Sequence, residues 1–122
     1  MSHDIEKMYC GVINRGDIFL CEYEKKQLEA VVLQDGVLSS SLPTVVCALI
    51  KFIIPDEKIF PNEVLLKASE TLLEKDYICQ LHKIITVDRR AMQKKIGKVS
   101  EEKLQSIYKA LDVNLGRFRD KN

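Results

Sequence analysis

The sequence contains few residues that break regular structure and few that bind metals. Its 122 residues include five Gly, three Pro and two His, with no Trp and no low-complexity tract, which argues against a disordered chain and against a multidomain enzyme. The four Cys form no CxxC pair, whereas metal sites usually show paired ligands. We therefore expect no metal and no other cofactor, and we expect the thiols to be free, three of them buried in apolar runs. The four thiols are Cys10, Cys21, Cys47 and Cys79.

An excess of one charge is also lacking, as are long hydrophobic runs. Nineteen Lys plus Arg against eighteen Asp plus Glu give a net charge of +1, so that any site for nucleic acid must be a local patch. The longest apolar run, Val45–Ile50, spans six residues, whereas a membrane-spanning helix needs about 20. The first residues mix acids with bases and lack the pattern of a secretory signal. We expect a cytoplasmic protein that does not contact a membrane.

The sequence does contain enough apolar material for one core. Hydrophobic residues make up 46% of the chain, and a domain of this length buries about two thirds of the surface that its unfolded chain exposes. No internal repeat and no Ser/Gly linker divides the sequence. These features predict a single domain over residues 1–122, with loose ends at about 1–11 and 117–122.

Short runs rich in β-branched residues, separated by Gly, Pro and charged residues, are typical of β-strands. Gly16 precedes the first run, and a short charged turn at residues 24–27 (EKKQ) separates it from the second. We expect these two strands to pair as a hairpin, and we expect residues 39–41, all Ser, to be a polar loop. The five predicted strands cover residues 18–21, 30–33, 44–54, 63–66 and 77–85.

The last third of the chain changes to the periodicity of a helix. Ser100 is a good N-cap and is followed by two Glu, which suit the positive start of a helix. Apolar residues then recur at spacings of three and four up to Gly116, the expected stop. Residues 88–97, DRRAMQKKIG, are predicted to form a shorter helix. Strands followed by helices indicate an α+β domain with a small, strongly curved sheet or barrel.

The order of these elements, together with several short stretches of sequence, resembles the MazF/PemK family of toxins from type II toxin–antitoxin systems. The stretches lie in the first strand, the central strand, the strand that Pro61 opens and the segment before the last helix. They read RGDIFL (15–20), LPTVVCA (42–48), FPNEVLL (60–66) and IITVDRR (84–90), and the resemblance covers about residues 12–116.

This resemblance implies a small SH3-like β-barrel of about five to seven strands with a C-terminal amphipathic helix, the α+β fold shared by MazF, PemK and CcdB toxins. It also implies a homodimer that acts as a metal-independent endoribonuclease on single-stranded mRNA. An antitoxin peptide that fills the substrate groove is the partner that it implies.

The sequence departs from the family at the positions that carry catalysis. The resemblance places an Arg, normally followed by Pro, at the start of the second strand, and a Thr or Ser at the end of the central strand. Here residues 27–32 read QLEAVV, Lys51 stands where the hydroxyl is expected, and Ile85 replaces a further Arg. No Arg occurs anywhere from Asp17 to Asp88. Because the loss of one donor to the reacting group typically slows a reaction about a hundredfold or more, we expect weak or lost cleavage.

Two residues are weak candidates for a rebuilt catalytic site. Metal-free RNA cleavage needs a proton acceptor, a proton donor and a cation beside the phosphate. Lys51 could supply the cation, although a lysine that ends a strand with its ammonium in water has the same pattern. His82 could transfer protons near neutral pH, although a solvent-facing His on an alternating strand is more common. Glu29 could act as a base, but its place beside a short turn also suits an exposed strand residue.

A dense basic segment near residues 88–98 predicts a place where the RNA backbone or an acidic antitoxin peptide would bind. The same charges also suit the solvated face of a helix. The candidates for RNA binding are Lys83, Arg89, Arg90, Lys94 and Lys95.

Three functions remain open from the sequence. The first is a toxin that descends from RNA-cleaving enzymes and cleaves weakly through a rebuilt site. The second is a catalytically inactive module on the same fold that binds RNA or a peptide. The third is a gyrase poison related to CcdB, and it fits least, because those relatives use a Trp-Gly-Ile terminus and this chain contains no Trp.

Overall fold

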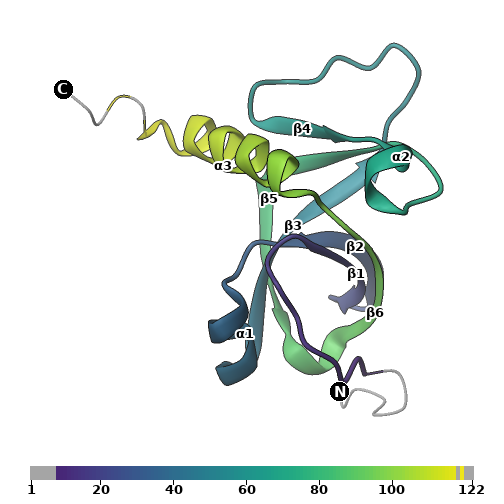
Figure 1. The fold of residues 1–122 in the computed structure, drawn as a ribbon, viewed down its shortest axis with the longest axis vertical. Helices are drawn as coiled ribbons and strands as arrows, with labels where there is room; N and C mark the ends of the chain where they lie inside the picture. Colours follow the sequence, from purple (N-terminus) through teal and green to yellow (C-terminus); the bar gives the residue numbers. More distant parts are fainter. Residues whose placement is uncertain (1–7, 118, 120–122) are drawn as a thin grey trace.

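The computed structural model describes residues 8–117 and 119. In that part of the chain, six strands and four helices follow one another along the chain as drawn in Figure 1. The strands are β1 (Asp17–Tyr23), β2 (Lys26–Val32), β3 (Thr44–Phe52), β4 (Glu63–Leu66), β5 (Tyr77–Asp88) and β6 (Met92–Lys98). The helices are α1 (Gly36–Ser41), α2 (Ala68–Thr71), the short 3-10 helix η2 (Arg89–Ala91) and α3 (Glu101–Leu115).

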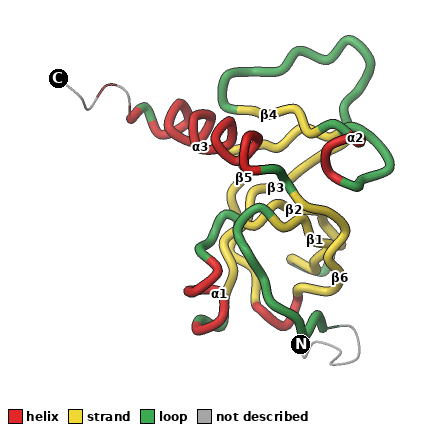
Figure 2. The backbone as a smooth tube through the Cα atoms, viewed as in Figure 1, coloured by secondary structure: helices red, strands yellow, loops and turns green. Residues whose placement is uncertain are grey.

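The strands form one antiparallel sheet in the order β4-β5-β3-β2-β1-β6. The sheet curls strongly, as the tube in Figure 2 shows. Within the described residues its edge strands, β4 and β6, are not paired with each other, so the barrel stays open. α3 packs against β4 and β5. The α+β class is therefore confirmed, with a small sheet of six strands and a C-terminal helix. The five predicted strands all exist, and four of them have shifted ends.

β1 and β2 form the predicted hairpin, in which Tyr23 lies opposite Lys26 at the turn. The two turn residues are Glu24, with a φ of 49°, and Lys25, with a φ of 66°. Positive φ at both positions is the geometry of a type I′ turn, which matches the twist of the flanking strands. The turn therefore has Glu and Lys at the two positions where Asn and Gly are preferred.

The long strand β5 bends between its two ends. Two register-paired stretches of β3 and β5 are separated by one residue of β3, Leu49, but by four residues of β5, 80–83. Extra residues of this kind bend a strand and increase its twist. The bend leaves His82 and Lys83 exposed.

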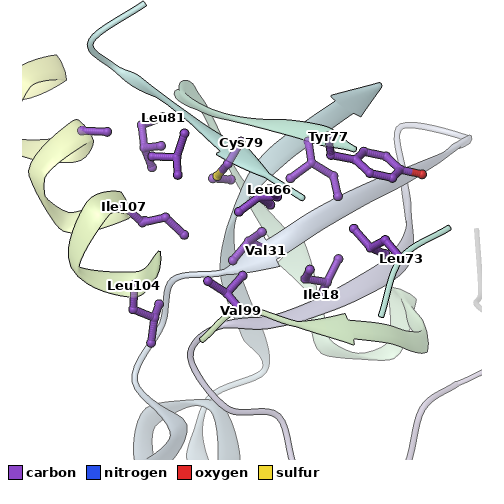
Figure 3. Close-up of a cluster of buried hydrophobic side chains, with 14 residues drawn as sticks. Ile18, Val31, Leu66, Leu73, Tyr77, Cys79, Leu81, Val99, Leu104 and Ile107 are labelled. Atoms are coloured by element: carbon purple, nitrogen blue, oxygen red, sulfur yellow. The ribbon is translucent and has the colours of Figure 1, made fainter. Parts of the chain in front are cut away.

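Apolar side chains pack on both faces of the sheet, because neighbours along a strand point to opposite sides. Ile18 and Val31 belong to the first cluster, which α3 covers with Leu104 and Ile107 (Figure 3). The second cluster consists of Ile13, Phe19, Cys21, Ala30, Val32, Val45, Cys47, Val87, Ala91 and Met92. The curled sheet thus has a core on each face.

α3 begins and ends as the sequence predicts. The Ser100 hydroxyl accepts a hydrogen bond from the Lys103 amide at 3.1 Å. Gly116 has a φ of 68°, the left-handed conformation in which helices often end and which favours Gly. Neither α3 nor any other helix of the described chain is long and apolar enough to cross a membrane.

The prediction of a helix over residues 88–97 is wrong, because the chain there makes the single turn η2 and then forms β6. Met92 is buried opposite Cys21 of β1, so that pairing with a sheet edge overrides the helical preference of this Lys-rich and Gln-containing segment. The prediction of a polar loop at residues 39–41 is also wrong, since these residues end α1. Ser39 is buried there and its hydroxyl lies 3.3 Å from the Gln34 amide nitrogen.

The expected loose ends fall partly outside the described residues, namely at 1–7, 118 and 120–122. Closer to the core, the ring of Tyr9 packs edge-on against Phe19, with 4.8 Å between the ring centroids. The described part of the N-terminal segment therefore contacts the second apolar cluster.

The thiols are free, as predicted. Cys21, Cys47 and Cys79 are buried, and Cys10 is exposed. Burial raises the pKa of Cys21 to about 11 and that of Cys79 to about 12. Burial, with a smaller contribution from Cys21, also raises the pKa of Cys47.

Candidate functional site

A hollow of 430 Å³ lies between β2, β6 and the segment that leads into β5. It adjoins the end of the first apolar cluster that α3 leaves uncovered. Figure 3 shows Tyr77 at that end, with its hydroxyl pointing away from Leu104 and Ile107. We call this space the Glu29 hollow. It is lined by Glu29, Phe52, Leu72, Leu73, Glu74, Lys75, Tyr77, Lys94, Lys95 and Ile96.

A hydrogen bond between Glu29 and Tyr77 fixes the polar centre of the hollow. The Tyr77 hydroxyl lies 2.9 Å and 3.1 Å from the two carboxylate oxygens of Glu29, and the Tyr77 residue is only 5% exposed. Burial, together with the hydrogen bond to Glu29, raises the pKa of Tyr77 to about 12. The phenol therefore stays protonated at neutral pH and donates to the carboxylate.

Lysines from two segments line the same space, namely Lys75 of the loop before β5 and Lys94 and Lys95 of β6. Glu29 of β2 and Lys94 of β6 both lie opposite Leu20 of β1 in the sheet register, and residues in register across neighbouring strands point to the same face. Lys95 lies 3.1 Å from an oxygen of Asp17, whose side chain is fully buried. Both lysines are exposed, and Lys95 is in addition held by an internal carboxylate.

An exposed aromatic ring lies beside these charges. Phe52 ends β3, is 50% exposed, and has its ring centroid 4.7 Å from that of Tyr77. The ammonium of Lys75 lies 4.9 Å from the centroid of the Phe52 ring, which is within the range of a cation–π contact. The exposed Phe52 ring could stack with a flat group, and the lysines could bind an anion.

The Glu29 hollow thus brings together groups that metal-free phosphodiester chemistry uses. It has a carboxylate that could accept a proton, a hydroxyl that donates, and cations that could face a phosphate. In the described residues, no three His, Cys, Asp or Glu side chains gather as a metal site.

Lys51, the first catalytic candidate, lies outside this hollow. Its ammonium forms an ion pair with Glu57 in the loop after β3, and the same carboxylate accepts a hydrogen bond of 3.0 Å from the Ile54 amide. The hydrogen bond from Lys51, and then that from Ile54, lower the pKa of Glu57. Lys51 therefore ties the loop to the strand.

His82, the second catalytic candidate, lies elsewhere again. It lines a separate hollow with Phe60, Pro61 and Asn62 of the loop before β4, and with two residues of α3. Lys51 lies opposite Ile78 in the sheet, four residues before His82, which is about 13 Å of strand. The structure does not bring Lys51 and His82 together in one hollow.

The basic candidates are divided between internal contacts and free positions. Arg89 donates at 2.8 Å to the carbonyls of Tyr9 and Gly11, and so holds the N-terminal segment. Arg90 forms an ion pair with Asp88, which raises the pKa of Arg90 through a hydrogen bond and through charge attraction. The other candidates are Lys83, exposed at the bend of β5, and Lys94 and Lys95, which line the Glu29 hollow.

Sequence reasoning missed Phe52, Lys75 and Tyr77 and weighed Glu29 as an exposed strand residue. Tyr77 follows Glu29 by 48 positions, and only the pairing of β5 with β3 and of β3 with β2 brings the two side chains together. A pattern of neighbouring residues carries no signal for such a contact. The polar residues of the loop before β5 gave no signal either, because short charged loops are common on any protein surface.

Comparison with protein families matches residues 14–115 to the family described as "PemK-like, MazF-like toxin of type II toxin-antitoxin system". Two similar proteins are named "Endoribonuclease MazF". The protein from Staphylococcus saprophyticus is 29% identical over 112 residues, which cover 86% of this chain and 92% of the relative. The protein from Staphylococcus epidermidis is 30% identical over the same length and coverage.

Solved structures agree on the fold. An endoribonuclease from a mycobacterial species, in complex with its cognate antitoxin, superimposes with a TM-score of 0.73 at 18% identity, covering 85% of this chain and 95% of that one. A MazE–MazF crystal structure (Form-II) from Deinococcus radiodurans gives a TM-score of 0.70 at 17% identity, covering 87% of this chain and 97% of the other. This chain therefore shares the fold of these proteins.

Proposed function

This chain belongs to the PemK-like, MazF-like family of toxins of type II toxin–antitoxin systems, and from that membership we propose that it is an endoribonuclease that cleaves single-stranded RNA slowly. The 2′-hydroxyl of the RNA is the nucleophile in such cleavage, so that the protein must accept and donate a proton and must stabilise the charge on phosphorus. The endoribonucleases among its relatives support the reaction class.

We infer the slow rate from one observation, which is that the Arg and the hydroxyl expected from the family resemblance are replaced. Residues 27–32 contain no Arg, and Lys51 stands at the position of the hydroxyl. The Lys51 ammonium is also engaged by Glu57, which leaves it less available to a phosphate. Each lost donor costs about a hundredfold in rate or more.

The Glu29 hollow supports weak cleavage over complete loss. It offers exposed lysines beside an aromatic ring, which binding of RNA also uses. It adds a half-buried carboxylate, a proton acceptor that binding alone does not need. If the protein cleaves no RNA, it is instead an inactive binding module.

We further propose that the protein acts in the cytoplasm as a homodimer and that a segment of an antitoxin binds it. The mycobacterial and Deinococcus proteins of the same fold have been solved with their antitoxins. With a net charge of +1, the chain would bind an acidic peptide through local lysines rather than through a global field.

Induced expression in a bacterial host tests this function. We expect slowed growth together with new RNA ends that carry a 5′-hydroxyl, and relief on co-expression of an antitoxin-like reading frame that adjoins the gene. Normal growth without new RNA ends would favour the inactive binding module. Arrested growth with broken DNA and intact RNA would favour a gyrase poison.

A further inference from the structure

We propose that the Glu29 hollow is the RNA-cleaving site of this chain, with Glu29 as the proton acceptor and Lys94 as the cation that faces the reacting phosphate. This inference rests on the proposed function and assigns its chemistry to residues other than the replaced Arg and hydroxyl.

The first argument is the way in which Glu29 is held. Both of its carboxylate oxygens lie within hydrogen-bond distance of the Tyr77 hydroxyl, at 2.9 Å and 3.1 Å. The phenol is fixed in turn by burial of its ring, at 5% exposure, and by contact with Phe52. A carboxylate fixed in this way faces the hollow in one orientation and keeps lone pairs free for a second donor. Tyr77 therefore acts as a positioning residue for Glu29.

The second argument is the division of work between two adjacent lysines. Lys95 neutralises the buried Asp17 at 3.1 Å and so serves the fold. Lys94 lies across β1 from Glu29, with Leu20 between them in register. Two inter-strand spacings of about 5 Å each separate the two backbones, so that a phosphodiester held by both the carboxylate and the ammonium would span the intervening Leu20.

The third argument is the neighbouring aromatic surface. Phe52 is half exposed and has Lys75 over its ring. Stacking of a base on an aromatic ring contributes about 1–3 kcal/mol and tolerates any base. A nucleotide whose base stacks on Phe52 would place its phosphate toward the lysines of the hollow.

In the proposed step, the 2′-oxygen of the ribose forms a bond to phosphorus while the bond from phosphorus to the 5′-oxygen of the next nucleotide breaks. The proton of the 2′-hydroxyl passes to Glu29, and the leaving 5′-oxygen takes a proton from the Lys94 ammonium. The products are a 2′,3′-cyclic phosphate and a 5′-hydroxyl. Exchange with water then returns a proton to Lys94 and removes one from Glu29, so that no oxidant or co-reactant is needed.

Three matched variants test the assignment on a labelled single-stranded RNA transcript in EDTA. Glu29→Gln keeps the shape and an acceptor for Tyr77, and we expect it to lower kcat by about a hundredfold or more. Lys94→Met removes the ammonium and keeps most of the stem, and we expect a loss of about tenfold to a hundredfold. Lys109→Met makes the same change on α3, at an exposed position outside the hollow, and is expected to stay within about twofold of the wild type.

Tyr77→Phe tests the positioning role. We expect kcat to fall about tenfold while KM stays unchanged, because the substrate still binds but the carboxylate loses its donor. A Tyr77→Phe protein that melts at a lower temperature and yet keeps kcat would show that the phenol serves only the fold.

Binding measurements separate this inference from the proposed function. An RNA with 2′-O-methyl groups cannot react, and we expect Glu29→Gln to bind it within about threefold of the wild-type Kd. If the wild type cleaves RNA and Glu29→Gln and Lys94→Met cleave equally fast, the site lies elsewhere and only this inference fails. If the wild type neither binds nor cleaves RNA, the proposed function fails with it.

Discussion

At the residue scale, two pairs of polar groups lie at the Glu29 hollow, Lys95 with Asp17 and Tyr77 with Glu29. These pairings decide which groups remain available to a substrate. Asp17 is fully buried and forms an ion pair with Lys95. Tyr77 donates a hydrogen bond to Glu29, and the carboxylate can still accept a proton from a substrate. An unpaired buried charge is costly, so that Lys95 is committed to Asp17 although it and Lys94 are both exposed.

The thiols give a residue-scale prediction. Because the thiolate is the reactive form, a thiol that is buried and has a raised pKa reacts slowly at pH 8. We expect an alkylating reagent to label Cys10 within minutes and to leave the other three thiols unlabelled until the chain unfolds. Mass spectrometry of the native and the urea-unfolded protein counts the labels, and prompt labelling of Cys47 in the native state would contradict the burial of the second cluster.

Single residues were the least predictable feature of the site. The sequence identified Lys94 and Lys95 as part of a basic segment, but it could not show that Lys95, and not Lys94, pairs with Asp17. In the same way Lys51 looked free, whereas Glu57 from the following loop binds it. Such pairings depend on the positions of side chains in three dimensions, which composition and spacing do not contain.

At the element scale, the β1–β2 hairpin carries avoidable strain. Glu24 and Lys25 both have positive φ, a conformation that costs a residue with a β-carbon about 1 kcal/mol or more. Replacement by Asn at position 24 and Gly at position 25 supplies the residues that a type I′ turn prefers.

We expect the double variant Glu24→Asn/Lys25→Gly to raise the free energy of unfolding by about 1 kcal/mol, after the greater freedom of Gly in the unfolded chain is subtracted. Urea denaturation measures the change. The control is Lys26→Gly at the first residue of β2, which we expect to destabilise the protein because no positive φ is relieved there. A double variant that is less stable than the wild type would show that the turn is not of type I′.

Elements were predictable where local signals agreed with tertiary packing. α3 has an N-cap at Ser100, a stop at Gly116 and an apolar stripe between them, and it covers the span that these signals predict. β6 has no such agreement, because its lysines and Gln favour a helix while the open edge of β1 offers pairing partners. Gly97 of β6 also allows close contact, since a β-carbon there would lie 2.4 Å from the Thr71 carbonyl oxygen.

At the scale of the whole molecule, the buried thiols and Tyr77 make folding sensitive to alkaline pH. Their pKa values are raised by burial in the folded chain, so that above pH 9 the unfolded chain releases protons that the folded chain keeps. The unfolded state then binds fewer protons, and the free energy of unfolding falls as pH rises. The loss begins near pH 9 for the thiols and near pH 10 for the phenol.

We expect each such group to lower the free energy of unfolding by about 1.4 kcal/mol per pH unit within its window. Urea titrations at pH 8, 9, 10 and 11 measure the slope. Cys79→Ala should show a shallower slope between pH 9 and 11, whereas Cys10→Ala should keep that of the wild type. Equal slopes in all three proteins would mean that Cys79 ionises in the folded state.

The fold of the whole chain was more predictable than its site. Short matching stretches in the right order, from residue 15 to residue 90 and on into α3, were enough to indicate the family and the α+β sheet with its helix. The Glu29 hollow was not predictable, because it forms where β2, β6 and the start of β5 meet, and those segments are far apart in sequence.

The rate of RNA cleavage by the purified protein tests the central claim most directly. The measurement is the single-turnover cleavage of a long single-stranded RNA in EDTA, run beside one of the endoribonuclease relatives. The expected result is cleavage that is clearly detectable and about a hundredfold slower than that of the relative, or slower still. Cleavage at the relative's rate, or none at all during prolonged incubation with excess protein, would contradict the account.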